Sequence, residues 1–299
     1  MTTVLGLDIG GTSLKLGAWC GDERLAWRDG IAVPMSSDGS EVAGCVAREV
    51  QSFADGLSAT PQALGVGSCG LIRGGVIYQS PNTPWDELPL EQLLEARLGY
   101  PVHLLNDADA FLLGALGDWA PGAMAALGIT LGTGLGTAVW LGGRLLLGGA
   151  GISPEGGHIT IDYDGEIANT GIPGTWESLA CRAALLSYYA GEGGRADDPL
   201  QVADAAARGE ASALRAWARY GGCLGAGLGS LCNVFSPEVV LIGGGMAGAH
   251  QFFEEALAEA VNRHMLRALP RPCLTFLPQL PEAVARGAAK YAALMVDHV

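Results

Sequence analysis

Two apolar segments that each run into a glycine turn constrain the fold of this 299-residue chain more than any other feature. The first is Leu7-Asp-Ile-Gly-Gly-Thr12, and the second is Ile129-Thr-Leu-Gly-Thr133. The residues after each turn suit a returning strand, so each segment predicts a β-hairpin. Strands alternating with helices follow each hairpin, which is typical of an α/β fold. The likeness suggests two related halves that join near residue 118.

The hydrophobic periodicity along the chain predicts the other elements. We expect strands over 4–9, 13–19, 63–67, 101–105, 123–131, 136–141 and 239–242. We expect helices over 39–57, 176–190, 210–234, 249–267 and 282–296.

Composition narrows the class of protein. Apolar residues make up 49% of the chain, which argues against disorder. The formal net charge of −14 disfavours binding to a DNA or RNA backbone, because no excess of Lys and Arg exists to replace counterions. Backbone N–H groups or Mg²⁺ can still bind a small anionic ligand.

The cysteines and the N-terminal segment indicate a cytoplasmic chain. The seven cysteines are scattered and never spaced CxxC, so we expect reduced thiols. The first residues lack the basic and long apolar regions of a signal peptide. Residues 119–143 carry no charge and are long enough to cross a bilayer. However, Pro121 and the glycines from Gly132 to Gly136 interrupt a helix, so we expect two strands and no membrane partner.

The two glycine turns are suited to cradling a polyphosphate, because glycine lets backbone N–H groups approach phosphates closely. Thr12 and Thr133 add hydroxyl donors, and Asp8 is placed to hold Mg²⁺ directly or through water. Gly243-Gly-Gly245 follows a predicted strand, a usual place for a nucleotide. The alternative is two ordinary hairpins in a glycine-rich chain, since both classical nucleotide fingerprints are missing.

Polar side chains near predicted strand and helix ends form the second candidate group. Asn106-Asp107 either caps a helix or supplies a general base at the carboxyl end of a strand. Glu155, His158 and Glu177 can hydrogen-bond sugar hydroxyls, although Glu177 also suits a helix N-terminus. A metal at these three residues is disfavoured, because no cysteine or second histidine stands nearby.

Taken together, these motifs resemble those of the ROK family of sugar kinases and repressors, within the sugar kinase/Hsp70/actin superfamily. The matching segments are Asp8–Thr12, Ser80–Trp85, Leu105–Asp109, Leu131–Thr137, Glu155–His158 and Val239–Gly245. The resemblance implies a two-domain α/β fold of the actin-like ATPase type (a duplicated ribonuclease H-like unit) with an interdomain cleft. A small domain would span 1–117 with the C-terminal helix 283–299, and a large domain would span 118–282.

The resemblance also implies an activity, namely ATP-dependent phosphorylation of a hexose, with glucose as the default, at its 6-hydroxyl. Asp107 would be the general base. The implied sugar ligands are Asn82, Asn106, Asp107, Glu155, His158 and Glu177. The implied ATP ligands are Asp8, Gly10, Gly11, Thr12, Lys15, Thr133, Gly134, Gly243, Gly244 and Gly245, with Mg²⁺ near Asp8.

Several alternatives remain open, and the family suggests a homodimer. The donor can be polyphosphate, the acceptor can be an N-acetylhexosamine, or the chain can bind sugar without turnover. A repressor is disfavoured, because the first phosphate strand starts at Val4 and leaves no room before it for a helix-turn-helix.

One segment departs from the family pattern. Members carry CxCGxxGCxE, whose cysteines bind a structural zinc together with the histidine that corresponds to His158. Here the three cysteine positions are Ala168, Thr170 and Thr175. Alanine cannot ligate zinc and threonine is a poor ligand, so we expect no structural zinc.

Overall fold

The computed structural model describes residues 2–11, 13–80, 83–167 and 170–296. The chain divides into two compact units. Unit 1 comprises Met1–Pro121, Leu145–Pro154 and Pro281–Val299, and unit 2 comprises Gly122–Arg144 and Glu155–Leu280.

The segment Leu145–Pro154 groups with unit 1, whereas the sequence placed it within a large domain at 118–282. Its Ser153 hydroxyl donates a hydrogen bond to the carboxylate of Asp109, which is buried in unit 1. Side-chain contacts of this kind link residues far apart in the sequence, so hydrophobic patterns do not predict them.

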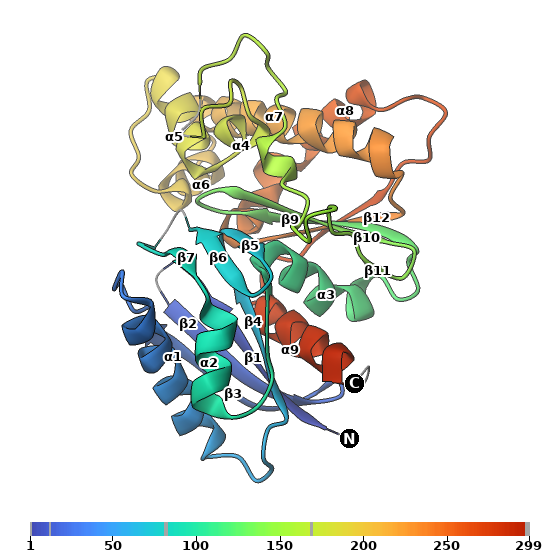
Figure 1. The fold of residues 1–299 in the computed structure, drawn as a ribbon. Coiled ribbons are helices and arrows are strands. Elements are labelled where there is room, and N and C mark those ends of the chain that lie inside the picture. Colours follow the sequence, from blue (N-terminus) through green and yellow to red (C-terminus); the bar gives the residue numbers. More distant parts are fainter. Residues whose placement is uncertain (1, 12, 81–82, 168–169, 297–299) are drawn as a thin grey trace. The chain divides into compact units, whose positions relative to one another are not determined.

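A five-stranded sheet in the order β3-β2-β1-β4-β8 forms the centre of unit 1 (Figure 1). Its strands are β1 (Thr3–Ile9), β2 (Ser13–Cys20), β3 (Glu23–Ala32), β4 (Ala63–Ser68) and β8 (Val102–Asn106). β1 and β2 form the predicted antiparallel hairpin, and β1, β4 and β8 run parallel. Ile9, Ser68 and Asn106 lie in one register row, so the residues that follow them share one edge of the sheet.

Helices cover both faces of this sheet. Leu5, Leu7 and Ile9 point to the face that packs with α1 (Gly39–Ala54) and α2 (Leu90–Leu98). The opposite face packs against α9 (Ala283–Val296). There, a Cβ on Gly6 would lie 1.8 Å from the carbonyl oxygen of Ala285, so only glycine permits this backbone approach.

The helix that carries the predicted catalytic segment packs equally closely on α9. This helix, α3 (Asp107–Trp119), begins where β8 ends. A Cβ on Gly114 would lie 1.9 Å from the Ala283 oxygen, and one on Gly287 would lie 1.7 Å from the Ala110 oxygen. The two helices therefore meet backbone to backbone (Figure 1), which fixes the start of α3 relative to the sheet.

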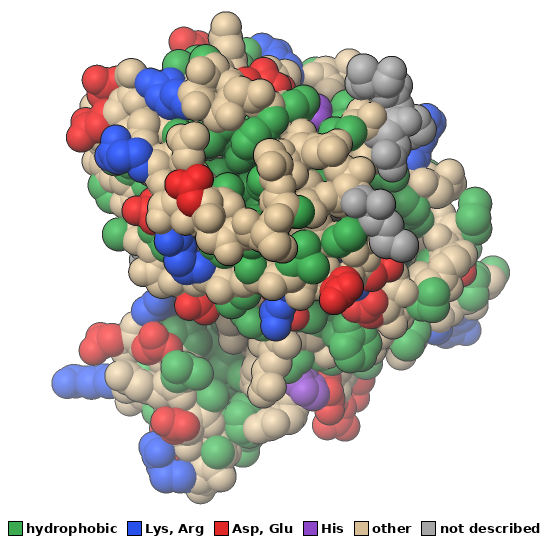
Figure 2. All heavy atoms as spheres, turned by 90° about the horizontal axis from the view of Figure 1, so that it is seen from below, with side chains coloured by type: hydrophobic (Ala, Val, Ile, Leu, Met, Phe, Trp, Pro, Cys, Tyr) green, Lys and Arg blue, Asp and Glu red, His purple; other side chains and the backbone are tan. Residues whose placement is uncertain are grey.

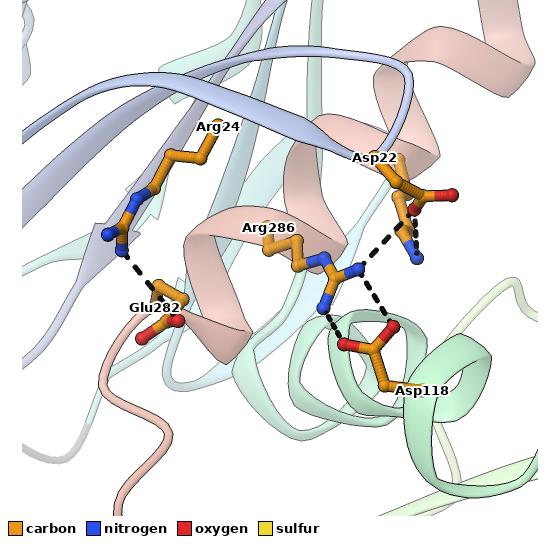
Figure 3. A network of polar contacts seen from close by, with 6 residues as sticks. Asp22, Arg24, Asp118, Glu282 and Arg286 are labelled. Atoms are coloured by element: carbon orange, nitrogen blue, oxygen red, sulfur yellow. Dashed lines mark hydrogen bonds and ion pairs between the residues drawn. The ribbon is translucent and has the colours of Figure 1, made fainter.

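An ion-pair network fastens α9 to two other parts of unit 1 (Figure 3). The Arg286 guanidinium contacts both carboxylate oxygens of Asp118 at the end of α3. It also pairs with Asp22 in the β2–β3 turn at 3.4 Å, and Lys290 pairs with Asp22 at 3.0 Å. The Arg286 contact lowers the pKa of Asp118.

The edge strand β8 is protected by carboxylates from α2. Glu91 accepts a hydrogen bond from the Leu104 amide at 2.8 Å, and Glu95 accepts one from the Val102 amide at 3.1 Å. These contacts occupy two donors that an edge strand would otherwise leave unpaired. A small antiparallel sheet of β5 (Leu71–Arg73), β6 (Val76–Gln79) and β7 (Asp86–Leu88) lies between β4 and α2 in the sequence and was not predicted.

Unit 2 repeats the sheet order of unit 1, with β11-β10-β9-β12-β13. Its strands are β9 (Ala125–Leu131), β10 (Leu135–Leu141), β11 (Arg144–Leu145), β12 (Val239–Gly243) and β13 (Cys273–Phe276). β9 and β10 are the second predicted hairpin, so the charge-free segment forms strands. Within the described ranges, the helices are all too short or too polar to span a membrane.

The longest helix of unit 2, α7 (Ala211–Phe235), packs along α8 (Glu254–His264). A Cβ on Gly225 would lie 2.4 Å from the Leu257 oxygen, which shows how closely the two helices approach. The remaining helical segments are η1 (Gly156–His158), α4 (Trp176–Leu179), α5 (Arg182–Gly191), α6 (Pro199–Ala207) and η2 (Gly245–Phe252).

Two predicted helices were wrong in their extent. The helix expected over 176–190 breaks at Ala180, and α5 starts afresh at Arg182, whose amide donates to the Gly132 oxygen. The helix expected over 249–267 is preceded by the short turns of η2 and ends at His264. In the first case a tertiary hydrogen bond overrides a continuous apolar pattern.

Candidate active site

The first glycine turn joins β1 to β2 and is braced by an ion pair inside the hairpin. Asp8 and Lys15 face each other in register, and Lys15 Nζ donates to Asp8 Oδ2 at 2.8 Å. The Asp8 side chain is 7% exposed, and this burial raises its pKa while Lys15 opposes the rise. Gly10 donates to the Ser13 oxygen and Gly11 is exposed. Thr12 lies outside the described residues.

Asn106 and Asp107 both accept a hydrogen bond from the Ala108 amide at the start of α3. Asn106 is the N-cap of α3, and its side-chain oxygen accepts from the Ala108 amide at 2.8 Å. Asp107 is the first residue of α3 and is half-buried at the carboxyl edge of the sheet. Since Asn106 lies in the same register row as Ile9, Asp107 and the first glycine turn follow at one edge of the unit 1 sheet. Asn82 lies outside the described residues.

The second glycine turn joins β9 to β10 and is held from outside the hairpin. Within it, Gly132 donates to the Gly134 oxygen at 3.0 Å, and Thr133 is exposed at its tip. The Leu135 amide donates to Glu177 Oε2 at 2.8 Å. Sequence reasoning assigned Glu177 to the sugar and missed this contact, which links positions far apart along the chain.

The third glycine segment ends β12 beside the second turn. Gly243 pairs with Thr130, so both segments end at the same edge of the unit 2 sheet. Gly244 has a φ of +89°, and a Cβ there would lie 2.3 Å from the Leu131 oxygen. A Cβ on Gly245 would meet no heavy atom within 4 Å, so the space above this residue is open.

Glu155 and His158 lie at the two ends of η1 in unit 2. Glu155 Oε2 is 3.9 Å from His158 Nε2. Partial burial raises the pKa of Glu155, His158 opposes this rise, and the negative charge of Glu177 adds to it. The backbone is anchored by the Gly156 amide, which donates to Thr137 Oγ1 at 2.8 Å. The structure therefore groups Glu155, His158 and Glu177 electrostatically.

Each glycine segment by itself suits contact with a phosphate or a nucleotide. Gly244 leaves no room for a side chain, and the exposed Gly11, Thr133 and Gly245 present accessible backbone. A Mg²⁺ ion would be held mainly by phosphate oxygens, with Asp8 as a carboxylate ligand directly or through water. In the described ranges, no group of three or more His, Cys, Asp or Glu side chains is arranged to hold a metal by itself.

The loop after His158 does not offer a zinc site. Thr175 Oγ1 already accepts from the Ser178 amide at 3.1 Å and caps α4. The His158 Nδ1 atom is buried and accompanied by no cysteine, because Thr170 and Thr175 stand at cysteine positions. One nitrogen and hydroxyls are a poor donor set for Zn²⁺. Ala168, the other cysteine position, lies outside the described residues.

A backbone clasp centred on Gly174 orders this loop instead. The Gly174 oxygen accepts from the amides of Ile161 and Asp162, and its amide donates to the Glu166 oxygen. Gly174 has a φ of +50°, and a Cβ there would lie 1.8 Å from the Asp162 oxygen. The clasp therefore requires glycine at this position and leads directly into Thr175 and α4.

Comparisons with known proteins agree with this geometry. The ROK family model matches residues 4–294. The glucokinase of Thermotoga maritima is 31% identical over 283 residues, which cover 88% of this chain and 88% of that protein. The crystal structure of the ROK hexokinase from Thermus thermophilus has a TM-score of 0.88 and 33% identity, with 100% of both chains covered.

A third relative was solved with ligands. The ROK family glucokinase from Streptomyces griseus, in complex with glucose and AMPPNP, has a TM-score of 0.83 and 26% identity and covers 98% of this chain and 99% of that one. The expected two-domain actin-like α/β fold is thereby confirmed. The family model extends over nearly the whole chain, and the chain belongs to the ROK family.

Proposed function

We propose that this chain is an ATP-dependent hexokinase that phosphorylates the 6-hydroxyl of a hexose, with glucose as the principal substrate. One observation carries the proposal furthest. Asp107 stands half-buried at the start of α3, on the same sheet edge as the first glycine turn, while Asn106 performs the capping. Oδ1 of Asp107 also accepts from the Ala108 amide at 2.9 Å, and this contact orients the carboxylate at the edge where we propose that it takes the proton. The Streptomyces griseus relative, solved with glucose and AMPPNP, and the glucokinase of Thermotoga maritima support the same substrates.

Asp107 acts as the general base. Its carboxylate accepts the proton of the sugar hydroxyl as that oxygen attacks the γ-phosphorus, and the bond to the bridging oxygen breaks to release ADP. A positioned base contributes about 10²–10⁴-fold to such a rate. The N-terminus of α3 favours the ionised carboxylate, because helix N-termini stabilise negative charge.

The other groups position the two substrates, since phosphoryl transfer depends mainly on positioning and charge neutralisation. Asn106, Glu155, His158, Glu177 and Asn82 are the sugar ligands in this proposal. The glycine segments, Thr12, Thr133 and Lys15 bind the nucleotide. Mg²⁺ supplies charge neutralisation at the phosphates when bound, and Asp8 is its protein ligand.

ATP is favoured over polyphosphate as the donor. Gly243 to Gly245 form a separate segment beside the second turn, which suits an adenosine and has no use with a phosphate chain. On the face drawn in Figure 2, the described Lys and Arg side chains stand apart from one another and form no continuous basic surface there. A long polyanion would gain from such a surface.

A coupled ADP-release assay with Mg-ATP tests the proposal. The panel contains glucose, mannose, fructose, N-acetylglucosamine and N-acetylmannosamine, and it is repeated with polyphosphate by measuring the sugar phosphate. We expect turnover with ATP, fastest with glucose. Fastest turnover with an N-acetylhexosamine would correct the substrate. If no sugar is phosphorylated with either donor, but calorimetry detects sugar binding, a non-catalytic sugar-binding protein would be favoured.

The proposal also includes assembly and location. We expect a homodimer, as the family resemblance implies, and a cytoplasmic location, as the scattered cysteines indicate. Light scattering of the purified chain measures the mass directly, and a monomer at micromolar concentration would contradict the dimer.

A further inference from the structure

The second glycine turn depends on a helix outside its own hairpin. The Leu135 amide donates to Glu177 Oε2 in α4, and the Arg182 amide at the start of α5 donates to the Gly132 oxygen at 3.1 Å. Both contacts come from the segment 177–182. The turn is therefore held by two hydrogen bonds from outside its hairpin. Sequence analysis assigned Glu177 to the sugar site and assigned no role to Arg182.

The Glu177 carboxylate also packs closely against Gly134 in the turn. A Cβ on Gly134 would lie 2.4 Å from Glu177 Oε2 and 3.2 Å from its Cδ. Glycine at position 134 thus leaves the space that the Glu177 carboxylate occupies. This close fit agrees with the hydrogen bond from the Leu135 amide and puts the turn and the carboxylate in one arrangement.

The helix that carries Glu177 is itself firmly placed. Thr175 caps it through the Ser178 amide, and the Trp176 amide donates to the Ile159 oxygen at 2.8 Å. The Trp176 ring is fully buried, and a Cβ on Gly227 of α7 would lie 2.3 Å from it. Glu177 is therefore presented from a fixed backbone, which a positioning residue requires.

We propose that Glu177 is a positioning residue for the second phosphate turn and that it couples nucleotide binding to sugar binding. This inference rests on the proposed function. Oε2 holds the Leu135 amide, and a carboxylate can accept at both oxygens, so a sugar hydroxyl can be bound at Oε1. A sugar that restrains the carboxylate then restrains the turn, and the nucleotide binds to a turn already ordered.

The test is calorimetric binding of Mg-AMPPNP in the absence of sugar, with Glu177→Ala and Glu177→Gln. We expect Glu177→Ala to weaken nucleotide binding by about 10- to 100-fold, as removal of a charge-assisted hydrogen bond predicts. Glu177→Gln keeps an acceptor oxygen for the Leu135 amide, so its nucleotide affinity should stay within about threefold of the parent. Glu192→Ala, which removes an exposed carboxylate of unit 2 paired with Arg215, is the matched control.

Gly134→Ala provides a second route to the same change. Its Cβ displaces the end of a flexible side chain, so the variant should fold, and near-ultraviolet circular dichroism checks this. If the Cβ acts by displacing Glu177, the double variant Gly134→Ala/Glu177→Ala binds AMPPNP no more weakly than Glu177→Ala alone. Additive losses would mean that the Cβ blocks the nucleotide directly and would count against the inference.

Coupling is read from the same titrations repeated at saturating glucose. The parent should bind AMPPNP more tightly with glucose, and Glu177→Ala should lose that gain. Unchanged AMPPNP affinity in Glu177→Ala, with only the KM for glucose raised, would overturn the inference and leave the kinase proposal intact. Failure of the parent chain to bind AMPPNP at all would overturn both.

Discussion

The two glycine turns are built on the same sheet topology but are braced in different ways. In the first hairpin, Asp8 and Lys15 face each other in register and form an ion pair. In the second hairpin the corresponding row pairs Thr130 with Gly136, which has no side chain to contribute. There the brace comes from Glu177 on α4.

This difference shows that two hairpins of the same topology are braced by different contacts. Among the described residues, the first turn is held by hydrogen bonds from Lys15 to Asp8 and from Gly10 to Ser13, which lie within its own hairpin. The second turn is connected through α4 to Thr175 and the Gly174 clasp, and through the charge of Glu177 to Glu155. The second turn can therefore respond to the candidate sugar residues, and the first cannot do so by this route.

Loss of the internal brace should have the largest effect on stability. Lys15→Met leaves the buried Asp8 carboxylate without its cation, and breaking a buried pair costs up to about 3–5 kcal/mol. Urea unfolding measures the loss. The pKa of Asp8, already raised by burial, should rise further, so the variant loses stability as pH increases from about 4 through that pKa. The double variant Asp8→Asn/Lys15→Met should recover part of the loss, and equal stability of Lys15→Met and the parent would contradict the brace.

Disruption of the clasp should have the next largest effect. Gly174→Ala must accept a left-handed backbone, which costs an alanine about 1–2 kcal/mol, and also a contact with the Asp162 oxygen. Gly171→Ala is the matched control, because Gly171 also has a positive φ but no heavy atom within 4 Å of its Cβ position. We expect Gly174→Ala to weaken glucose and AMPPNP binding together, measured by calorimetry. Equal effects of the two alanines would show that the clasp does not order the site.

Removal of the α4 cap is a milder way to disturb the external brace. Thr175→Ala deletes the acceptor for the Ser178 amide and should cost about 0.5–2 kcal/mol. Thr175→Ser keeps the hydroxyl and should behave as the parent. Thermal unfolding gives the stability change, and nucleotide affinity should fall in Thr175→Ala but not in the serine variant. Equal stability and equal nucleotide affinity of Thr175→Ala and Thr175→Ser would show that the cap does not contribute to the brace.

Zinc chelation should have no effect. The loop offers a poor donor set for Zn²⁺ and is held by backbone hydrogen bonds. A zinc-selective chelator added with excess Mg²⁺ should leave turnover and thermal stability unchanged. Stoichiometric zinc in the purified chain by mass spectrometry, or loss of activity on chelation, would contradict this prediction.

Local patterns predicted both hairpins and most of the helices, and they placed the candidate site residues at strand and helix ends. Alternation identified both hairpins, and the position of Asn106 after a strand indicated a cap as one of two alternatives, because these signals lie within a few residues. The small strands β5 to β7 were not predicted, because each is only three or four residues long and shows too little alternation. The hydrogen bond from the Leu135 amide to Glu177 was not predicted. Tertiary packing brings these two residues together, and local patterns give no signal for it.

The most direct test of the account is the turnover of Asp107→Asn with Mg-ATP and glucose, measured beside calorimetric binding of both ligands. Asparagine keeps the shape of the side chain and cannot take the proton, while Asn106 still caps α3. We expect kcat to fall by about 10²–10⁴-fold while the affinities for glucose and AMPPNP are retained. Near-normal turnover by Asp107→Asn would contradict the assignment of Asp107 as the general base.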